Sequence, residues 1–272
     1  MPGYQWISFL SDFGVEDGFA AACRGVIAQI APSVRVIDVT HAVSPGDVRR
    51  GAAVLAQTIR HLPPSVHVAV VDPGVGTKRR AVAVVAGGHV LVGPDNGLIP
   101  WAADVLGGPE RAFEITNTSV MRHPVSKTFH GRDVFAPAAA HLCNGFPVEQ
   151  LGPPVAVEQL VKLPLPTSKL SDGEAVGEVL AVDGFGNVQT SLTGDMLAQV
   201  GLRAGRDLYL RAAQVSETVM YAETYGDVEE GDALVYVDSA GLVAVAVNGG
   251  RADEWLEVEP GDLLQLGPVP SE

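Results

Sequence analysis

The order of apolar runs along the chain limits the folds that it can adopt. Strand-like runs cover Trp6–Ser11, Val34–Val39 and Val66–Asp72. Helical patterns separate them, one over about Gly18–Ile30 and one beginning at Asp47. Strands that alternate with helices are typical of α/β domains, in which consecutive strands pair in parallel. We therefore expect an N-terminal α/β domain with a central, mostly parallel sheet.

Two short strands and a further helix extend this pattern. The strands, over Ala81–Gly87 and His89–Gly97, predict an antiparallel meander added to the parallel core. The helix is expected over Ala136–Leu142, with Asp133 as its capping residue and Gly145 as its end.

The pattern changes after residue 151. Residues 151–173 contain four prolines and little periodicity, which is typical of a linker. Beyond it, short strands are separated by Gly, Asp and Asn turns with no convincing helix, at Glu174–Val182, Asp207–Leu210, Ala233–Val237 and Leu242–Val247. This indicates a small β-barrel or sandwich. We predict an α/β domain over 1–165 and an all-β domain over 166–272.

The net negative charge of the chain arises entirely from its C-terminal part. Residues 1–165 carry 13 acids and 13 bases, whereas 166–272 carry 19 acids and 5 bases, which accounts for the net charge of −14. An acidic domain argues against a nucleic-acid partner. The sequence contains no apolar run of about 18 residues and no N-terminal signal pattern, so we expect a cytoplasmic protein without a membrane partner.

The stretch VVDPGVGTKRR, residues 70–80, places a carboxylate where an apolar strand ends. Ligands of open α/β sheets bind beyond the carboxyl ends of the strands, which favours a functional role for Asp72. A solvated turn aspartate beside surface cations is the alternative. Lys78, Arg79 and Arg80 follow the glycine turn.

Two other stretches follow the same pattern. SDFG contains Asp12, and TFHGRD contains His130. If the strands that end at Asp12 and Asp72 are parallel neighbours, both carboxylates lie at one sheet edge, where His130 can join them. Asp, Arg and His can together hold and deprotonate a water molecule, with His as the proton acceptor. The alternative for Asp12 is that it caps the helix that begins near Gly18.

Other chemistry is disfavoured. The remaining six histidines show no i,i+4 pairing and no cysteine partners, so we expect no metal site. GVGTKRR lacks the spacing of a phosphate-binding P-loop. In the C-terminal part, Phe185 could stack on a planar ring, and Asn187 or Asn248 could bind its polar edge, although ordinary turns explain these residues equally well.

Six stretches together resemble one enzyme family: SDFG, VVDPGVGTKRR, GPDNG, TFHGRDVFAPAAAHL, VDGFGNVQTSL and DSAGLVAVAVNGG. In this order they resemble the S-adenosyl-L-methionine hydroxide adenosyltransferases, which are related to the bacterial fluorinase and chlorinase. The resemblance implies an α/β domain, a C-terminal β-barrel, and a homotrimer whose active sites lie between the α/β domain of one subunit and the barrel of the next. It also implies that water attacks C5′ of S-adenosyl-L-methionine, the substrate, to give adenosine and L-methionine without a cofactor.

The resemblance assigns roles to individual residues. The catalytic set falls on Asp72, Arg79 and His130, which leaves Lys78 and Arg80 as surface charges. The substrate-binding set is Asp12 at the ribose hydroxyls, Asp183, Phe185, Asn187 and Ser239 at the methionine and ring portions, Asn248 and Gly249 at adenine, and Tyr225 as a further stacking residue.

Two alternatives remain within this resemblance. A halogenase would form 5′-chloro-5′-deoxyadenosine, but those relatives carry an aromatic and a hydroxyl residue at the DPGVG position and lack the histidine. Asp72 and His130 therefore favour hydrolysis. A protein that binds S-adenosyl-L-methionine without turnover is the second alternative, and the retention of all three catalytic residues argues against it.

Overall fold

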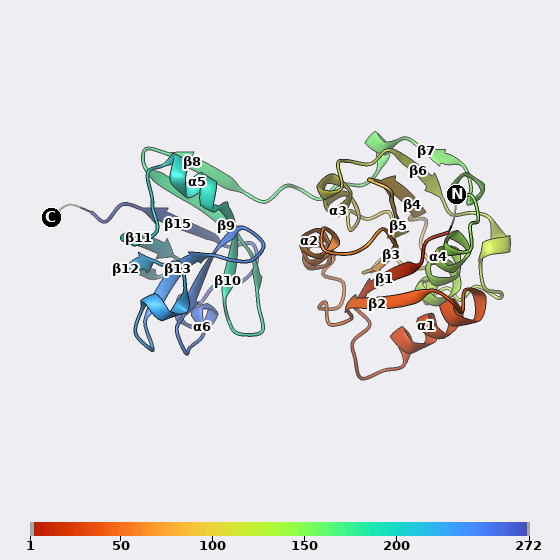
Figure 1. Cartoon of the computed structure of the whole chain (residues 1–272), viewed down its shortest axis with the longest axis horizontal. Helices are drawn as coiled ribbons and strands as arrows, with labels where there is room; N and C mark the ends of the chain where they lie inside the picture. Colours follow the sequence, from red (N-terminus) through yellow and green to blue (C-terminus); the bar gives the residue numbers. More distant parts are fainter. Residues whose placement is uncertain (1–2, 271–272) are drawn as a thin grey trace. The chain divides into compact units, whose positions relative to one another are not determined.

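The computed structural model describes residues 3–270 and forms two compact units. The boundary between them falls between Leu163 and Pro164. The first unit is an α/β domain and the second is a β-barrel, as expected (Figure 1).

The first unit contains a seven-stranded sheet. Its strands lie in the order β2 (Arg35–Thr40), β1 (Trp6–Ser11), β3 (Val66–Val70), β5 (His89–Pro94), β4 (Ala81–Ala86), β6 (Arg111–Glu114) and β7 (Pro154–Val155). The first four pair in parallel, and the last three pair antiparallel, so β6 runs in the same direction as the first four. Five of the seven strands therefore share one direction. The expected antiparallel pair is confirmed, because β4 pairs antiparallel with β5, and β5 joins this pair to the parallel strands through β3.

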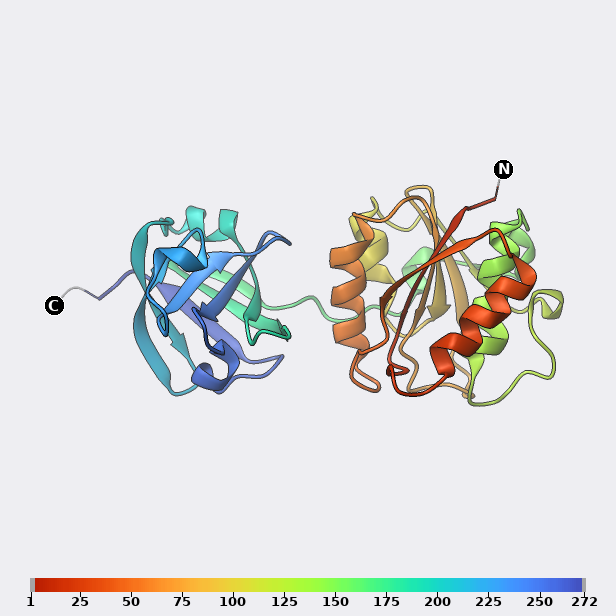
Figure 2. The ribbon, with the colours of Figure 1, turned by 60° about the horizontal axis from the view of Figure 1, so that its bottom comes forward.

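Helices cover both faces of this sheet (Figure 2). One face is covered by α1 (Phe19–Ile30) and α4 (Ala136–Cys143), and the other by α2 (Val48–Ile59) and α3 (Pro100–Val105). Short helical turns complete the unit: η1 (Thr118–Val120), η2 (Gly131–Phe135), η3 (Val148–Gln150) and η4 (Val157–Gln159). Because both faces are covered, the central strands β1, β3, β4 and β5 are buried at nearly every residue, and most of these residues are apolar.

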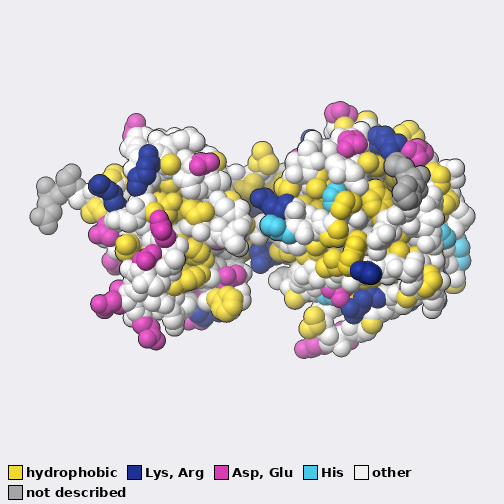
Figure 3. All heavy atoms as spheres, in the orientation of Figure 1, with side chains coloured by type: hydrophobic (Ala, Val, Ile, Leu, Met, Phe, Trp, Pro, Cys, Tyr) yellow, Lys and Arg dark blue, Asp and Glu magenta, His cyan; other side chains and the backbone are white. Residues whose placement is uncertain are grey.

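The second unit is a closed barrel of seven strands. In ring order they are β9 (Glu174–Val182), β10 (Val188–Thr193), β14 (Leu242–Val247), β13 (Ala233–Val237), β12 (Val215–Tyr221), β11 (Arg206–Ala212) and β15 (Leu263–Gly267), which pairs again with β9. Strand β8 (Ser168–Ser171) pairs with β9 outside the ring. Acidic side chains are scattered over the face of this unit seen in Figure 3, in agreement with the charge of its sequence.

The expectation that this part of the chain lacks helices was wrong. It contains α5 (Gly194–Gln199), α6 (Ala252–Leu256) and the helical turn η5 (Tyr225–Asp227). Each spans at most six residues, which is too short to show a helical period. The side chain of Thr193 accepts a hydrogen bond from Met196 N and so caps α5.

The predicted linker is shorter in the structure. Residues 154–155 and 168–171 form strands, and the stretch without regular structure covers 161–167. The N-terminal end of this irregular stretch is held by Asp95, which accepts a hydrogen bond from Val161 N at 2.9 Å. Arg80 pairs with this buried carboxylate and donates to Gln159 O at 2.6 Å. Arg80 thus lies at the surface as expected, with its side chain 31% exposed, but it is paired with a buried carboxylate that is distant in the sequence.

Three adjacent strands carry a buried chain of polar side chains. Ser8 Oγ lies 2.6 Å from His67 Nδ1, and His67 Nε2 lies 2.8 Å from His89 Nδ1. Burial and the neighbouring His89 lower the pKa of His67 to about 3. His67 is therefore neutral in the folded protein, whereas it titrates near pH 6.5 when the chain unfolds.

This difference predicts an acid-sensitive stability. Below pH 6.5 the unfolded chain binds a proton at His67, whereas the folded protein does not. The free energy of unfolding therefore falls as the pH drops from 6.5 towards 3, by about 1.4 kcal/mol per pH unit for one proton. In urea unfolding between pH 7 and 4, the slope of the free energy of unfolding against pH should be lower in His67→Gln than in wild type, by the equivalent of about one proton. The exposed His61 provides the control, because His61→Gln should leave the slope unchanged. An equal slope in wild type and His67→Gln would contradict this account.

Candidate active site

The structure brings Asp72, Arg79 and His130 together beyond the carboxyl end of β3. Asp72 lies two residues after β3, and Arg79 ends the turn that follows. His130 immediately precedes η2, a π-helical turn of the kind often found at functional sites. Strands β1 and β3 are parallel neighbours with Ser11 opposite Val70, so Asp12 follows at the same edge.

Arg79 forms the centre of this group. Its Nε donates to both Asp72 oxygens, at 3.0 and 3.1 Å, and its Nη2 also donates to Asp72 Oδ2. The same Nη2 donates to His130 Nδ1 at 2.8 Å. The side chains of Asp72 and Arg79 are only 6% and 11% exposed, which strengthens this charge-assisted pair relative to a surface pair. The ring of Phe135 lies 5.3 Å from the guanidinium carbon.

Glycine at position 76 allows the two loops of the site to meet. Gly76 has a φ of 77°, in the region that favours glycine. A Cβ on Gly76 would overlap the carbonyl oxygen of Lys127, which lies in the loop that leads to His130. The glycine turn therefore lets this loop approach closely enough for His130 to reach Arg79.

The partner of His130 determines where its proton lies. A guanidinium only donates, so His130 Nδ1 must accept, and the neutral ring carries its proton on Nε2. Burial, followed by the charge of Arg79, lowers the pKa of His130 below its ordinary value. His130 is therefore neutral at pH 7 and presents an N–H donor, which does not fit the proton-acceptor role expected from the sequence.

Asp12 does not cap α1. The residue before that helix is Gly18, and no side chain caps it. Asp12 Oδ2 instead accepts a hydrogen bond from Gly46 N at 2.9 Å, and Asp12 N donates to Val70 O at 3.3 Å. Asp12 is thus fixed at the sheet edge that carries the other polar residues.

The prediction that Asp133 caps a helix was wrong. It lies inside η2, is fully buried, and pairs with Arg132 and Arg122. Although burial raises its pKa, hydrogen bonds from Arg132 and from Ser126 N lower it overall. Asp133 thereby fixes the preceding loop against the turn that positions His130. The sequence could not reveal this role, because the partners at 122 and 126 follow no helical spacing.

In the barrel, five of the expected substrate-binding residues surround one cavity of about 480 Å³. They are Phe185, Asn187, Tyr225, Asn248 and Gly249. Phe185 is 80% exposed and Tyr225 is 41% exposed, so both rings are accessible at its mouth.

A hydrogen-bond network fixes the polar side of this cavity. Asp183 Oδ1 accepts from the backbone N–H of Phe185 at 2.8 Å and of Asn187 at 3.0 Å. Asn187 Nδ2 donates to Asp183 Oδ2 at 2.8 Å and to the Tyr225 hydroxyl at 3.2 Å. That hydroxyl donates to Tyr236, whose pKa is raised by burial, so that it stays neutral. Tyr236 was not among the predicted site residues, because its contact with Tyr225 arises only from folding.

Ser239 lies apart from these residues. It belongs to the turn between β13 and β14, which Asp238 holds by accepting from Ala240 N and Leu242 N. Asn248 follows the other end of β14. The six residues of that strand separate the two by about 20 Å at the usual rise per residue.

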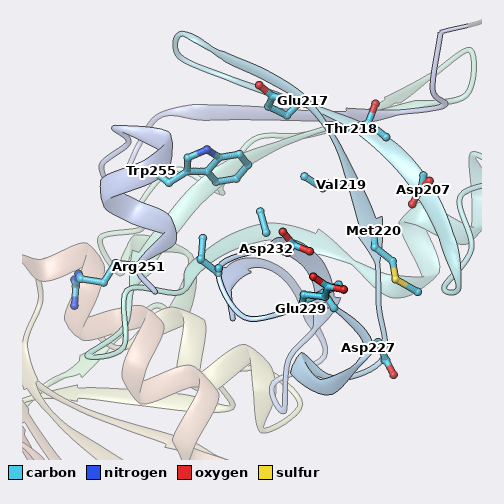
Figure 4. Close-up of a pocket in the computed structure, with 14 residues that line it drawn as sticks. Asp207, Glu217, Thr218, Val219, Met220, Asp227, Glu229, Asp232, Arg251 and Trp255 are labelled. Carbon is cyan, nitrogen blue, oxygen red and sulfur yellow. The ribbon is translucent and has the colours of Figure 1, made fainter. Parts of the chain in front are cut away.

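A second barrel cavity, of about 680 Å³, contains none of the expected residues (Figure 4). Its walls include several acidic side chains and Trp255. Among residues 3–270, no three His, Cys, Asp or Glu side chains are grouped so that they could hold a metal ion. In the same range, no helix is long and apolar enough to cross a bilayer.

Comparison with known proteins identifies relatives over nearly the whole chain. Residues 7–152 match the model of the SAM hydroxide adenosyltransferase N-terminal domain, and 177–265 match that of its C-terminal domain. An (R)-S-adenosyl-L-methionine hydrolase from Salinispora arenicola is 54% identical over 98% of this chain and 99% of that protein. A fluorinase from Actinopolyspora mzabensis is 30% identical over 89% of this chain and 90% of that protein.

A solved structure agrees with this result. The crystal structure of a conserved protein from Thermotoga maritima superposes with a TM-score of 0.91 at 36% identity. It covers 96% of this chain and 99% of that chain.

The geometry of His130 predicts a specific NMR signature. In wild-type protein, the side-chain ¹⁵N signals of His130 should show a proton on Nε2 and a pKa below 6.5. Arg79→Met removes a positive charge and the donor to Nδ1, while Asp72 and Asp133 still raise the pKa of His130, so this pKa should rise. A neutral ring protonated on Nδ1, or a pKa that Arg79→Met leaves unchanged, would contradict the assignment.

Proposed function

This chain belongs to the SAM hydroxide adenosyltransferase family, and on that premise we propose that it hydrolyses S-adenosyl-L-methionine. Water attacks C5′, the C5′–S bond breaks, and the products are adenosine, L-methionine and a proton. The observation that carries the proposal is the group of Asp72, Arg79 and His130 joined through one guanidinium.

The chemistry suits a site with a single basic group. The leaving group is a neutral thioether departing from a sulfonium, so it needs no general acid. Lowering the pKa of water from 15.7 to about 7 would require roughly 12 kcal/mol, a shift for which bound metal ions are known. One arginine and one histidine do not supply this in the ground state. Water therefore loses its proton as it attacks.

Hydrogen bonding favours Asp72 as the proton acceptor. Among residues 3–270, Asp72 Oδ1 accepts only from Arg79 Nε, whereas His130 Nδ1 is occupied by Arg79 Nη2. In this arrangement Arg79 stabilises the developing charge on the water oxygen, and His130 donates its Nε2 proton to the same region. Base assistance contributes about 10²–10⁴ in rate, and in-line positioning contributes up to roughly 7–11 kcal/mol.

The remaining substrate contacts divide between the units. Asp12 binds the ribose hydroxyls, and the barrel residues bind the rest of the substrate. Asn187, Asn248 and Gly249 line one cavity with two accessible aromatic rings, which fits a flat, polar-edged base. Asp183 holds the glycine turn of that cavity. Ser239, at the far end of β14, is assigned to the methionine portion.

We extend the proposal to the assembly and the location. The protein is a homotrimer with active sites between the α/β domain of one subunit and the barrel of the next. The ring of Phe185 supports this, since it is 80% exposed beside the barrel cavity, where a second subunit would cover it. A cytoplasmic location is supported by Cys23 and Cys143, which are free, buried thiols.

The proposal predicts a simple product pattern. Purified protein incubated with S-adenosyl-L-methionine should form adenosine and L-methionine in equal amounts. Asp72→Asn should lower turnover by about 10²–10⁴ with little change in substrate binding, because it removes the proton acceptor. Chromatography with mass spectrometry measures the products, and calorimetry measures binding.

Two outcomes would contradict this proposal. Accumulation of 5′-chloro-5′-deoxyadenosine in high chloride would indicate a halogenase, the activity class of the fluorinase relatives. Binding without any turnover would indicate a non-catalytic protein. Lys78→Met is the control variant. Lys78 lies in the same glycine turn as Arg79 but is exposed, so its replacement should leave turnover unchanged.

A further inference from the structure

A chain of polar side chains lies beside the loop that carries Asp12 and has no role in the reaction described so far. Ser11 Oγ lies 2.7 Å from His41 Nδ1, and His41 Nε2 lies 3.0 Å from Asp38 Oδ1. The other Asp38 oxygen pairs with Arg24 at 2.5 Å. We refer to these four residues, which come from β1, β2, α1 and the residue after β2, as the Ser11 relay.

The hydrogen atoms of the Ser11 relay have defined places. The Asp38 carboxylate only accepts, so His41 Nε2 donates to it. In the tautomer whose ring proton lies on Nε2, His41 Nδ1 accepts the Ser11 hydroxyl proton. Ser11 Oγ in turn accepts the backbone N–H of Phe13 at 3.3 Å. The hydroxyl of Ser11 is thus fixed on both sides.

The Ser11 relay contains the residue types of a hydrolytic triad, but Ser11 is not placed to act as a nucleophile. It has no exposed surface, and its hydroxyl is already engaged as donor and acceptor. A cavity of about 480 Å³ beside the relay is lined by Arg24, Asp38 and His41 but not by Ser11. No substrate atom can reach Ser11 Oγ there.

The contacts of the Ser11 relay converge on the loop that carries Asp12. His41 holds this loop twice, because its ring binds Ser11 and its carbonyl oxygen accepts from Gly14 N at 2.8 Å. Asp12 lies between these two anchors, with its Oδ2 fixed by Gly46 N. The hydrogen bond between Ser11 and His41 thus holds the loop beside Asp12, whose carboxylate is held directly by Gly46 N.

We propose that Ser11 is a positioning residue that acts through His41 and Asp38 to hold Asp12 in the geometry that binds both ribose hydroxyls. This makes the Ser11 relay a determinant of selectivity for a ribonucleoside over a 2′-deoxyribonucleoside. The inference rests on the proposed function, since it requires a ligand that contains adenosine. A vicinal diol is bound best by a carboxylate whose orientation is fixed before binding.

The test compares two ligands that differ by one hydroxyl. Calorimetry with the full chain, in saturating L-methionine, measures the dissociation constants of adenosine and 2′-deoxyadenosine. Ser11→Ala should weaken adenosine binding by about tenfold, as expected for one lost hydrogen bond, and 2′-deoxyadenosine binding much less. The preference for adenosine should therefore shrink.

Two variants of His41 separate positioning from general damage. In His41→Asn the side-chain amide can still accept from Ser11, and in His41→Gln that acceptor is displaced towards Asp38. We expect His41→Gln to lose the preference for adenosine as Ser11→Ala does, and His41→Asn to keep most of it. Urea midpoints of all three variants show whether they remain folded.

The outcomes distinguish the inference from the function on which it rests. If all three variants bind the two nucleosides in the wild-type ratio, whatever their stability, the Ser11 relay is merely structural and the inference is overturned. If the wild-type protein neither binds adenosine nor converts S-adenosyl-L-methionine, the proposed function fails, and the inference fails with it.

Discussion

The candidate site depends on the hydrogen bonds of one guanidinium. Arg79 binds both oxygens of Asp72 and donates to His130, so it joins two loops that are about 50 residues apart in the sequence. The close approach of those loops requires Gly76, and the position of His130 requires the buried charge of Asp133. In the function proposed above, this geometry assigns the roles: with Nδ1 engaged, His130 donates, and Asp72 accepts the proton.

The polar groups gather at this edge because of the sheet topology. Parallel pairing of β1 with β2 and β3 places the residues that follow each strand at one end of the sheet. The same topology brings Ser11, at the end of β1, next to His41, which follows β2. The proposed ribose-binding residue Asp12 therefore directly follows the residue that is proposed to position it. The apolar faces on both sides of the sheet fix this edge in place.

Much of the fold could be predicted from local patterns. Strand β1 and the barrel strands β9, β13 and β14 begin and end at the expected residues, because apolar runs between turns are a local signal. The helices α5 and α6 were missed because they are too short for periodicity. The roles of Arg80, Asp133 and Tyr236 could not be predicted, since each depends on partners brought close only by folding. The group of Asp72, Arg79 and His130 was expected because the stretches that contain these residues resemble those of a known family. The local sequence alone was equally compatible with Asp72 as a solvated turn residue.

The central claim is that water attacks C5′ of S-adenosyl-L-methionine under the control of Asp72 and Arg79. The most direct measurement is turnover in ¹⁸O-labelled water, followed by mass spectrometry of both products. The account predicts one ¹⁸O atom in the 5′-hydroxyl of adenosine and none in L-methionine. Label in L-methionine, or unlabelled adenosine, would contradict it.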